Sequence, residues 1–267
     1  MPPLLEKFLA FARRDLLIAS RYRGTLVTFP ITLVTELAGA YFLARAIGAG
    51  FRPDGFDYFT FLLIGSGVTQ LMVASMHAFV SSVRDAQLSG TMEMMMATAT
   101  RPLTVMLLSA TVLEIDRVVA FFVYVGCGFA LFRAPLHAPD PAALAVVLLL
   151  ASVMTISLGL LAAAIQLYFQ KGGAAVWLFA TAVWLLSGSM FPVSTLPAAL
   201  RSVAKLLPMT YVVKMTRDVL LVKATLPDLM APVLILTAAT ALLLPVSLWV
   251  FSAVLRNARL RGTLSMY

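Results

Sequence analysis

The chain has 267 residues, of which 61% are hydrophobic and only 12% carry a charge. Soluble domains carry charge on about a quarter of their residues, so this composition excludes a soluble globular protein. It predicts an all-α integral membrane protein with about six spanning helices and short loops. In so apolar a chain, the net charge of +8 is explained by basic residues that contact anionic lipid headgroups and anchor the cytoplasmic loops, so we expect no nucleic acid partner.

Residues 4–23 form a predicted amphipathic helix. Apolar side chains recur at helical spacing on one face, from Leu5 and Phe8 to Ala19, while basic residues such as Arg13 and Arg14 fill the opposite arc. A basic helix of this kind lies in the plane of the lipid headgroups. The pattern alone indicates a membrane anchor.

Six apolar segments are predicted to cross the membrane, at 25–47, 58–80, 116–132, 142–169, 173–190 and 229–255. Residues 103–113 are predicted to form an interfacial or inner-end segment before the third crossing. With both termini cytoplasmic, eleven lysines and arginines lie inside and eight outside, five of those eight at 201–223. Because the positive-inside rule weights short loops most, this distribution favours cytoplasmic termini.

The fifth apolar run, 173–190, ends at an unusual junction. Phe191-Pro192 interrupts the helix, because proline lacks an amide donor and has a fixed φ angle. Pro197 suits the first turn of a new helix, and Pro208 separates two short predicted helices at 198–207 and 210–222.

Neither short helix is long enough to cross a bilayer. The segment 191–222 is therefore predicted to be a re-entrant hairpin between the fifth and sixth spans. Such backbone is tolerated at membrane depth only where protein or a water-filled cavity surrounds it.

This region resembles the fifth-helix and re-entrant signature of ABC type-2 exporter permeases, the membrane subunits of drug, lipid and polysaccharide exporters. The matching residues are Ser187, Gly188, Phe191, Pro192, Leu196, Pro197, Pro208, Tyr211, Arg217 and Leu220. The family often has Asn-Pro-Leu where this chain has Leu207-Pro208-Met209. The resemblance implies a single transmembrane domain over 1–267, with an outer gate formed by Phe191, Pro192, Leu196, Pro197, Pro208 and Tyr211.

The cytoplasmic loop 84–100 carries a second resemblance. Its Gly90-Thr91-Met92-Glu93 is similar to the family's Gly-Thr-Leu-Glu pattern, and the tail at 259–264 resembles the ending of many members. In the family this loop couples the permease to the ATPase, which implies a coupling role for Arg84, Gly90, Thr91, Met92, Glu93 and Met95. An ordinary loop lying on the headgroups remains the alternative. For helix 4–23, the resemblance implies an interface helix beside the ATPase.

The chain has no P-loop motif G-x-x-x-x-G-K-[ST], no H-E-x-x-H motif and no nucleophile with a base at a known spacing. The sequence therefore predicts a transport subunit and no enzyme, with no cofactor or metal held by this chain. The resemblance implies that ATP and Mg²⁺ bind a separate cytoplasmic P-loop ATPase, present in two copies.

The resemblance also implies a second copy of the chain or a related permease, in the bacterial cytoplasmic (inner) membrane. The expected cargo of this exporter is a hydrophobic or amphipathic drug, lipid or lipid-linked glycan. A secondary transporter or channel without an ATPase is the alternative, although it would normally show internal repeats or several charges along the pathway.

Glu36 is the one acidic residue placed well inside a predicted span. It either contacts the translocation pathway or forms an interhelix hydrogen bond, with His77 or Arg117 as candidate partners. Glu114 and Arg117 are three residues apart and are predicted to pair on one helix face.

Overall fold

The structure, a computed structural model, describes residues 6, 8–10, 13, 17, 23–48, 50–88, 90, 102–132, 138–169 and 173–261. Within those ranges every regular element is a helix. The main helices are α2 (Arg23–Ile47), α3 (Tyr58–Leu88), α5 (Pro102–Phe132), α6 (Pro141–Phe169), α7 (Gly173–Leu186), α8 (Ala198–Leu206), α9 (Pro208–Leu221) and α10 (Met230–Arg261). Three short 3₁₀ helices, η1 (Pro53–Gly55), η2 (Val193–Thr195) and η3 (Leu226–Leu229), lie in the connections.

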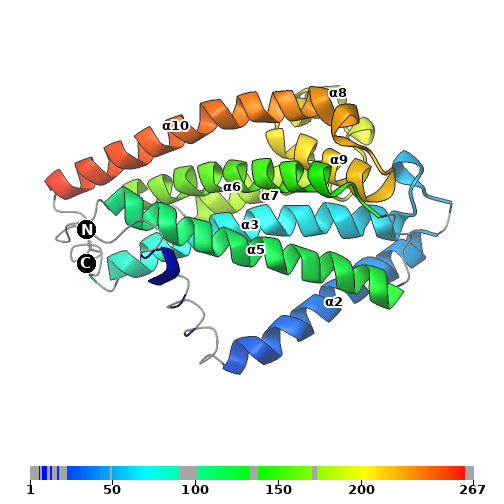
Figure 1. Cartoon of the computed structure of the whole chain (residues 1–267), viewed down its shortest axis with the longest axis horizontal. Coiled ribbons are helices and arrows are strands. Elements are labelled where there is room, and N and C mark those ends of the chain that lie inside the picture. The colour runs from blue at the N-terminus through cyan, green and yellow to red at the C-terminus, as the bar shows by residue number, and fades with distance from the viewer. Residues whose placement is uncertain are drawn as a thin grey trace.

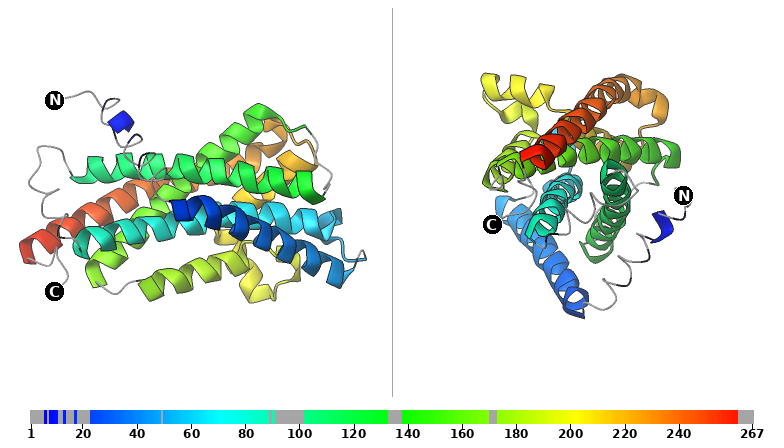
Figure 2. Two further views of the ribbon diagram at one scale, coloured as in Figure 1. Left: turned by 90° about the horizontal axis from the view of Figure 1, so that it is seen from below. Right: turned by 90° about the vertical axis from the view of Figure 1, so that its left-hand side faces the viewer.

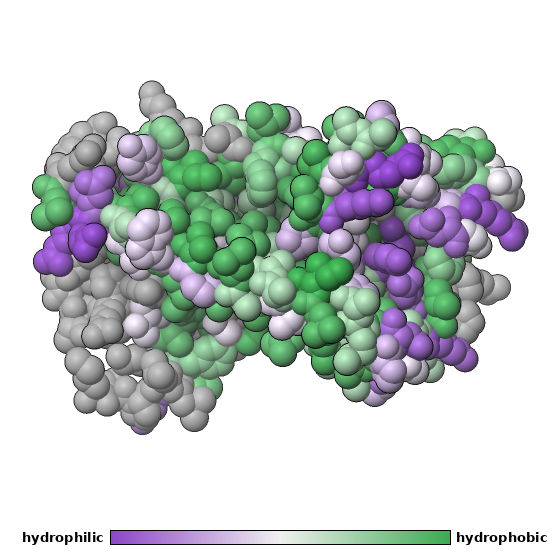
Figure 3. All heavy atoms as spheres, turned by 90° about the horizontal axis from the view of Figure 1, so that it is seen from above, coloured by the Kyte–Doolittle hydropathy of each residue, from purple (hydrophilic) through white to green (hydrophobic). Residues whose placement is uncertain are grey.

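Five of these helices are long and apolar enough to cross a membrane. The qualifying segments are Thr28–Ile47, Tyr58–Leu88, Leu107–Phe132, Pro141–Phe169 and Leu226–Leu260. Each reaches the roughly 20 residues that a bilayer core of about 30 Å requires. Figure 3 shows the corresponding surface, a broad belt of hydrophobic residues with hydrophilic residues gathered at the ends. The expected all-α membrane class is confirmed.

The expected fifth span, 173–190, is shorter than predicted. Helix α7 has 14 residues, about 21 Å at 1.5 Å per residue, which is less than the thickness of the bilayer core. The helix stops because Gly188 adopts a φ of 78°, a conformation that favours glycine. The hydroxyls of Ser187 and Ser189 then donate hydrogen bonds to the carbonyl of Trp184.

The third apolar region does not begin its crossing at about 116 as predicted, since its candidate span is Leu107–Phe132. It forms one continuous helix, α5, of 31 residues. No proline occurs between Pro102 and Pro135 to interrupt it. Charged side chains do not break a helix by themselves, and Glu114 is buried against α3 with a hydrogen bond to Ser75.

The bundle is built around α3, which packs against α2, α5, α6, α7 and α9, while α6 and α10 form the other large helix pair. The chain enters and leaves the bundle at the same end, and α8 and α9 lie towards the opposite end (Figures 1 and 2). The short helices agree with the predicted 198–207 and 210–222 to within two residues. Pro208 occupies the first turn of α9, where its missing amide donor costs nothing.

The packing of α6 against α3 depends on Gly159. A Cβ atom at this position would lie 2.4 Å from Cδ2 of Phe79, a buried ring with little room to move. We expect Gly159→Ala to lower the stability of the folded protein by about 1–3 kcal/mol, the usual cost of overpacking a core. Thermal denaturation followed by size-exclusion chromatography in detergent measures this loss.

Gly126→Ala on α5 is the matched control, because nothing lies within 4 Å of its Cβ position. An equal loss of stability in the two variants would show that the effect does not depend on the contact between α3 and α6, since alanine by itself favours a helix over glycine.

Within the predicted helix 4–23, the described residues are all helical, and they are Glu6, Phe8, Leu9, Ala10, Arg13, Leu17 and Arg23, the last of which begins α2. Leu9 and Leu17 are at least half exposed. The interface role of this helix stays a prediction.

Candidate functional site

A cavity of 710 Å³ opens between α2, α3 and α7 at the level of the apolar belt. Its polar lining comes from all three helices and consists of Glu36, Ser66, Thr69, Gln70, His77 and Thr181. Its aromatic lining is Tyr124, Trp177 and Trp184. Glu36, Gln70 and Trp177 are exposed in the single chain, so the cavity opens away from the bundle.

Glu36 on α2 accepts a short hydrogen bond from Nε2 of Gln70 on α3. Glu36 and Gln70 also line a second cavity, of 190 Å³, whose wall includes Arg117. Glu36 therefore has both features that the sequence left open, because it forms an interhelix hydrogen bond and it lines a cavity.

The partner of Glu36 is one that the sequence analysis missed. Gln70 occupies this position because α2 and α3 are antiparallel and joined by a short loop. Glu36 lies eleven residues before Ile47, and Gln70 lies twelve residues after Tyr58. Nearly equal distances from the loop place two residues side by side, so this count was the signal that would have found the pair.

The other two candidates lie apart from each other. His77 is on α3 two helical turns beyond Gln70 and lines the larger cavity. Arg117 lines only the smaller one and pairs with its neighbour Asp116, at 3.7 Å between Nη2 and Oδ2.

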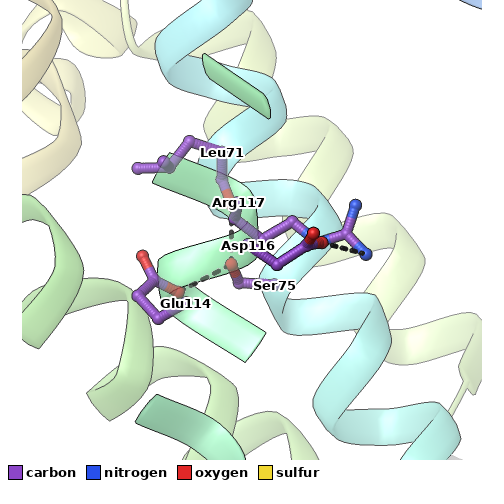
Figure 4. A network of polar contacts seen from close by, with 5 residues as sticks. All are labelled: Leu71, Ser75, Glu114, Asp116 and Arg117. Carbon is purple, nitrogen blue, oxygen red and sulfur yellow. Dashed lines mark hydrogen bonds and ion pairs between the residues drawn. The ribbon is translucent and has the colours of Figure 1, made fainter. Parts of the chain in front are cut away.

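The predicted pairing of Glu114 with Arg117 is wrong. Figure 4 shows the Glu114 and Arg117 side chains extending in opposite directions, with Glu114 bonded to Ser75 of α3 and Arg117 paired with Asp116. The hydroxyl of Ser75 lies 2.8 Å from Oε2 of Glu114 and 2.8 Å from the carbonyl of Leu71. Because Glu114 is buried between the helices, it bonds to Ser75 on α3 and not to Arg117 on its own helix.

The hairpin is held to the bundle by Arg217 on α9, whose side chain is only 5% exposed. Nη1 donates to the carbonyl of Gly188 at 2.8 Å. Nη2 donates to the carbonyls of Ser189 at 2.9 Å and of Phe61 at 3.0 Å. The guanidinium carbon lies 3.4 Å from the centroid of the Phe61 ring. One side chain thus joins α9 to the end of α7 and to the first turns of α3.

Gly65 on α3 makes room for this arrangement. A Cβ atom there would lie 2.2 Å from the carbonyl oxygen of Ser189 and 2.3 Å from Nη2 of Arg217. Arginine is not deprotonated in proteins, so the hydrogen bonds of Arg217 come from a charged donor.

The anchoring role of Arg217 was not predicted, although the residue is among those that match the family signature. The signal was its position in α9. Val213 and Leu221, four residues away on either side, are buried, so Arg217 falls on the apolar face of an otherwise amphipathic helix.

The predicted gate residues have different surroundings. Pro192 and Leu196 are buried, Phe191, Pro208 and Tyr211 are partly buried, and Pro197 is exposed. The hydroxyl of Tyr211 donates to the carbonyl of Lys205 at 3.0 Å and ties the end of α8 to α9. Tyr211 therefore stabilises the turn between the two helices of the hairpin.

The end of α3 at which the predicted coupling loop begins lies opposite the hairpin (Figure 1). Arg84 is exposed near the end of α3, and Gly90 adopts a φ of 67°. Thr91, Met92, Glu93 and Met95 lie outside the described residues, so their coupling role stays a prediction.

Comparison with known proteins agrees with this architecture. The family model described as ABC-2 type transporter matches residues 7–221, from the N-terminal segment to the end of α9. No curated protein sequence matches the chain. The match covers most of the chain, including the cavity-lining helices and the hairpin. The chain therefore belongs to the ABC-2 type transporter family and is a multi-pass membrane permease, a transport subunit without a catalytic domain.

Proposed function

We propose that the chain is the membrane subunit of an ATP-driven exporter that moves a hydrophobic or amphipathic substrate out of the cytoplasm or the inner leaflet. Permeases of this family generally pair with ATPase subunits. ATP and Mg²⁺ bind those subunits, two copies of which dock on the cytoplasmic side. The observation that carries the proposal is the polar cavity of 710 Å³ at the level of the apolar belt.

This cavity needs a second protomer. A charge exposed to the middle of a bilayer costs about 2.5–3.5 kcal/mol on insertion scales, and Glu36 is exposed near the middle of its span. A second copy of the chain, or a related permease, that faces the cavity across a two-fold axis removes these polar groups from lipid. The two half-cavities then enclose a pathway between the protomers.

The connectivity supports six crossings although α7 is short. Helix α6 ends at the end of the bundle that holds the termini, and α10 begins at the hairpin end (Figure 1). The chain between them must therefore pass from one end to the other, and α7 is the helix that does so. Helices α8 and α9 lie beside the spanning helices rather than beyond them, as a re-entrant hairpin requires.

We assign both termini and the 84–100 loop to the cytoplasmic side of a bacterial inner membrane, and the hairpin to the outer side. ATP binding brings the two ATPases together, the loop at 84–100 transmits this motion to α3, and the hairpin closes the outer end of the pathway.

The experiment that tests the function is purification of the tagged protein from its native membrane in mild detergent. A stoichiometric P-loop ATPase in the complex supports the exporter. A protein that stays intact in the membrane extract and carries no ATPase overturns it and favours a secondary transporter or channel.

Topology provides a second test. We expect a cysteine at Ala199, an exposed position on α8, to react with a membrane-impermeant maleimide added to intact cells, because α8 lies on the outer side. The background for this experiment is Cys127→Ser, which removes the only native cysteine. Labelling is measured as a mass shift.

Leu260→Cys is the matched control, since Leu260 is 81% exposed near the end of α10 at the opposite side of the bundle. It should react only after the membrane is permeabilised. The reverse pattern at the two positions would overturn the assigned orientation.

A further inference from the structure

The carboxylate of Glu36 has no cationic partner in the part of the chain that the structure describes. Its hydrogen-bond donor, Gln70, is neutral. Arg117, at the wall of the neighbouring small cavity, is paired with Asp116. Glu36 therefore directs a negative charge into the larger cavity without a protein group that neutralises it.

Aromatic rings surround the same space. Trp177 and Trp184 are seven residues apart and lie on one face of α7, with Thr181 between them, and all three line the cavity together with Tyr124 of α5. Trp177 is 59% exposed, so much of its ring is free for a ligand. Aromatic faces beside a carboxylate are the means by which proteins bind organic cations, and tryptophan is the best ring for this purpose.

We propose that this cavity binds a lipophilic cation, a molecule with one positive centre and an apolar, largely aromatic body. The proposal rests on the exporter function and specifies its substrate class. Two protomers related by a two-fold axis bring two Glu36 carboxylates to one pathway, and like charges in an apolar environment repel each other. A cationic substrate offsets this repulsion, whereas an anionic lipid or lipid-linked glycan increases it.

His77 and Tyr124 are the other titratable side chains at the cavity wall. The cavity lining contains no lysine or arginine in the part of the chain that the structure describes. Among the described residues that line the cavity, Glu36 is thus the only carboxylate that a bound cation meets.

The test uses two probes of nearly the same size and shape but opposite charge, tetraphenylphosphonium and tetraphenylborate. Their binding to the purified full-length chain in detergent is measured by equilibrium dialysis against protein-free micelles. We expect saturable binding of tetraphenylphosphonium that Glu36→Gln weakens about tenfold or more, with no loss of tetraphenylborate binding.

Glu114→Gln is the matched control. It makes the same chemical change at another acid within the spans, but Glu114 lines neither cavity and should leave the binding of both probes unchanged. If tetraphenylphosphonium and tetraphenylborate bind equally well, or if Glu36→Gln leaves phosphonium binding intact, the proposal is wrong.

Trp177→Leu tests the proposal independently if Glu36→Gln does not fold. Trp177 is exposed, so its replacement creates no void in the core, and it should weaken phosphonium binding more than borate binding. An equal effect on both probes would overturn the proposal.

The exporter function is tested separately, by the ATPase purification. If an ATPase co-purifies but the chain binds both probes equally, the cation proposal is wrong and the exporter function stands. If binding is charge-selective but no ATPase co-purifies, the exporter function is wrong and the cation site stands.

Discussion

Arg217→Met is expected to release the hairpin from the bundle and to lower the stability of the protein by about 3–5 kcal/mol. Hydrogen bonds from a charged group contribute about 1.5–3 kcal/mol each, and this side chain forms three of them. Bonds made by one side chain are not fully additive, so the expected loss is below their sum. The change also leaves carbonyl groups of Gly188 and Ser189 without this donor in a buried site. Because folded proteins are stable by only about 5–15 kcal/mol, the loss is a large share of the total.

The measurement is the temperature at which half of the protein aggregates in detergent, together with protease cleavage at the hairpin. Lys214→Met, one turn earlier on α9 and exposed, removes an equal charge and should behave like the unmodified protein. Arg217→Lys should fall between the two, since an ammonium group cannot reproduce the planar fork of guanidinium donors. A wild-type transition temperature for Arg217→Met would show that the three bonds do not hold the hairpin.

Gly65→Val is expected to have a comparable effect without removing any hydrogen-bonding group. Even one added carbon atom meets the backbone of Ser189 at 2.2 Å, and a backbone atom cannot rotate away as a flexible side chain does. The three branched carbon atoms of valine force the end of α7 and the Arg217 guanidinium away from α3. We expect loss of most folded protein from the detergent extract, and export to disappear with it.

Gly39→Val provides the comparison for this variant, because nothing lies within 4 Å of the Cβ position of Gly39 and it too is a glycine within a spanning helix. Gly65→Ala should show an intermediate loss. If the alanine and valine variants both fold as well as Gly39→Val, the close packing at Gly65 does not limit stability.

The fold was largely predictable because hydrophobicity in a membrane protein is distributed over whole segments. Apolar runs of 20 or more residues located the starts of four spans to within two residues, although α3 and α10 continue eight and six residues beyond the predicted ends. Prolines 197 and 208 located both short helices. Such signals are local, since each depends on one residue type and its immediate neighbours along the chain.

The errors arose where length alone was insufficient. The run 173–190 contains enough apolar residues to cross a bilayer, but the left-handed conformation of Gly188 ends α7 at Leu186. In α5, the charges at 114–117 suggested that the membrane crossing begins there, but the helix is continuous through them. Glu114 is accommodated by a hydrogen bond to α3, which the sequence of α5 alone does not indicate.

The candidate site was predicted only in part. Glu36 and His77 were identified because polar residues are conspicuous within apolar spans, and both line the large cavity. The contribution of α7 to this cavity, and the anchoring role of Arg217, depend on which helices pack together. Arg217 and Phe61 are separated by 156 residues, and no local pattern connects positions so far apart.

Helix α3 combines three features in one unbroken segment of 31 residues. The hairpin is bound near the start of α3, at Phe61, and the middle of α3 lines the cavity with Gln70 and His77. The predicted coupling loop begins near the end of α3, at Arg84. In the proposed exporter, if ATPase docking favours the open hairpin by some factor, thermodynamic linkage requires that the open hairpin favour docking by the same factor. A disulfide that locks the hairpin shut should then weaken binding of the proposed ATPase, about 35 Å away along the helix axis from Phe61 to Arg84.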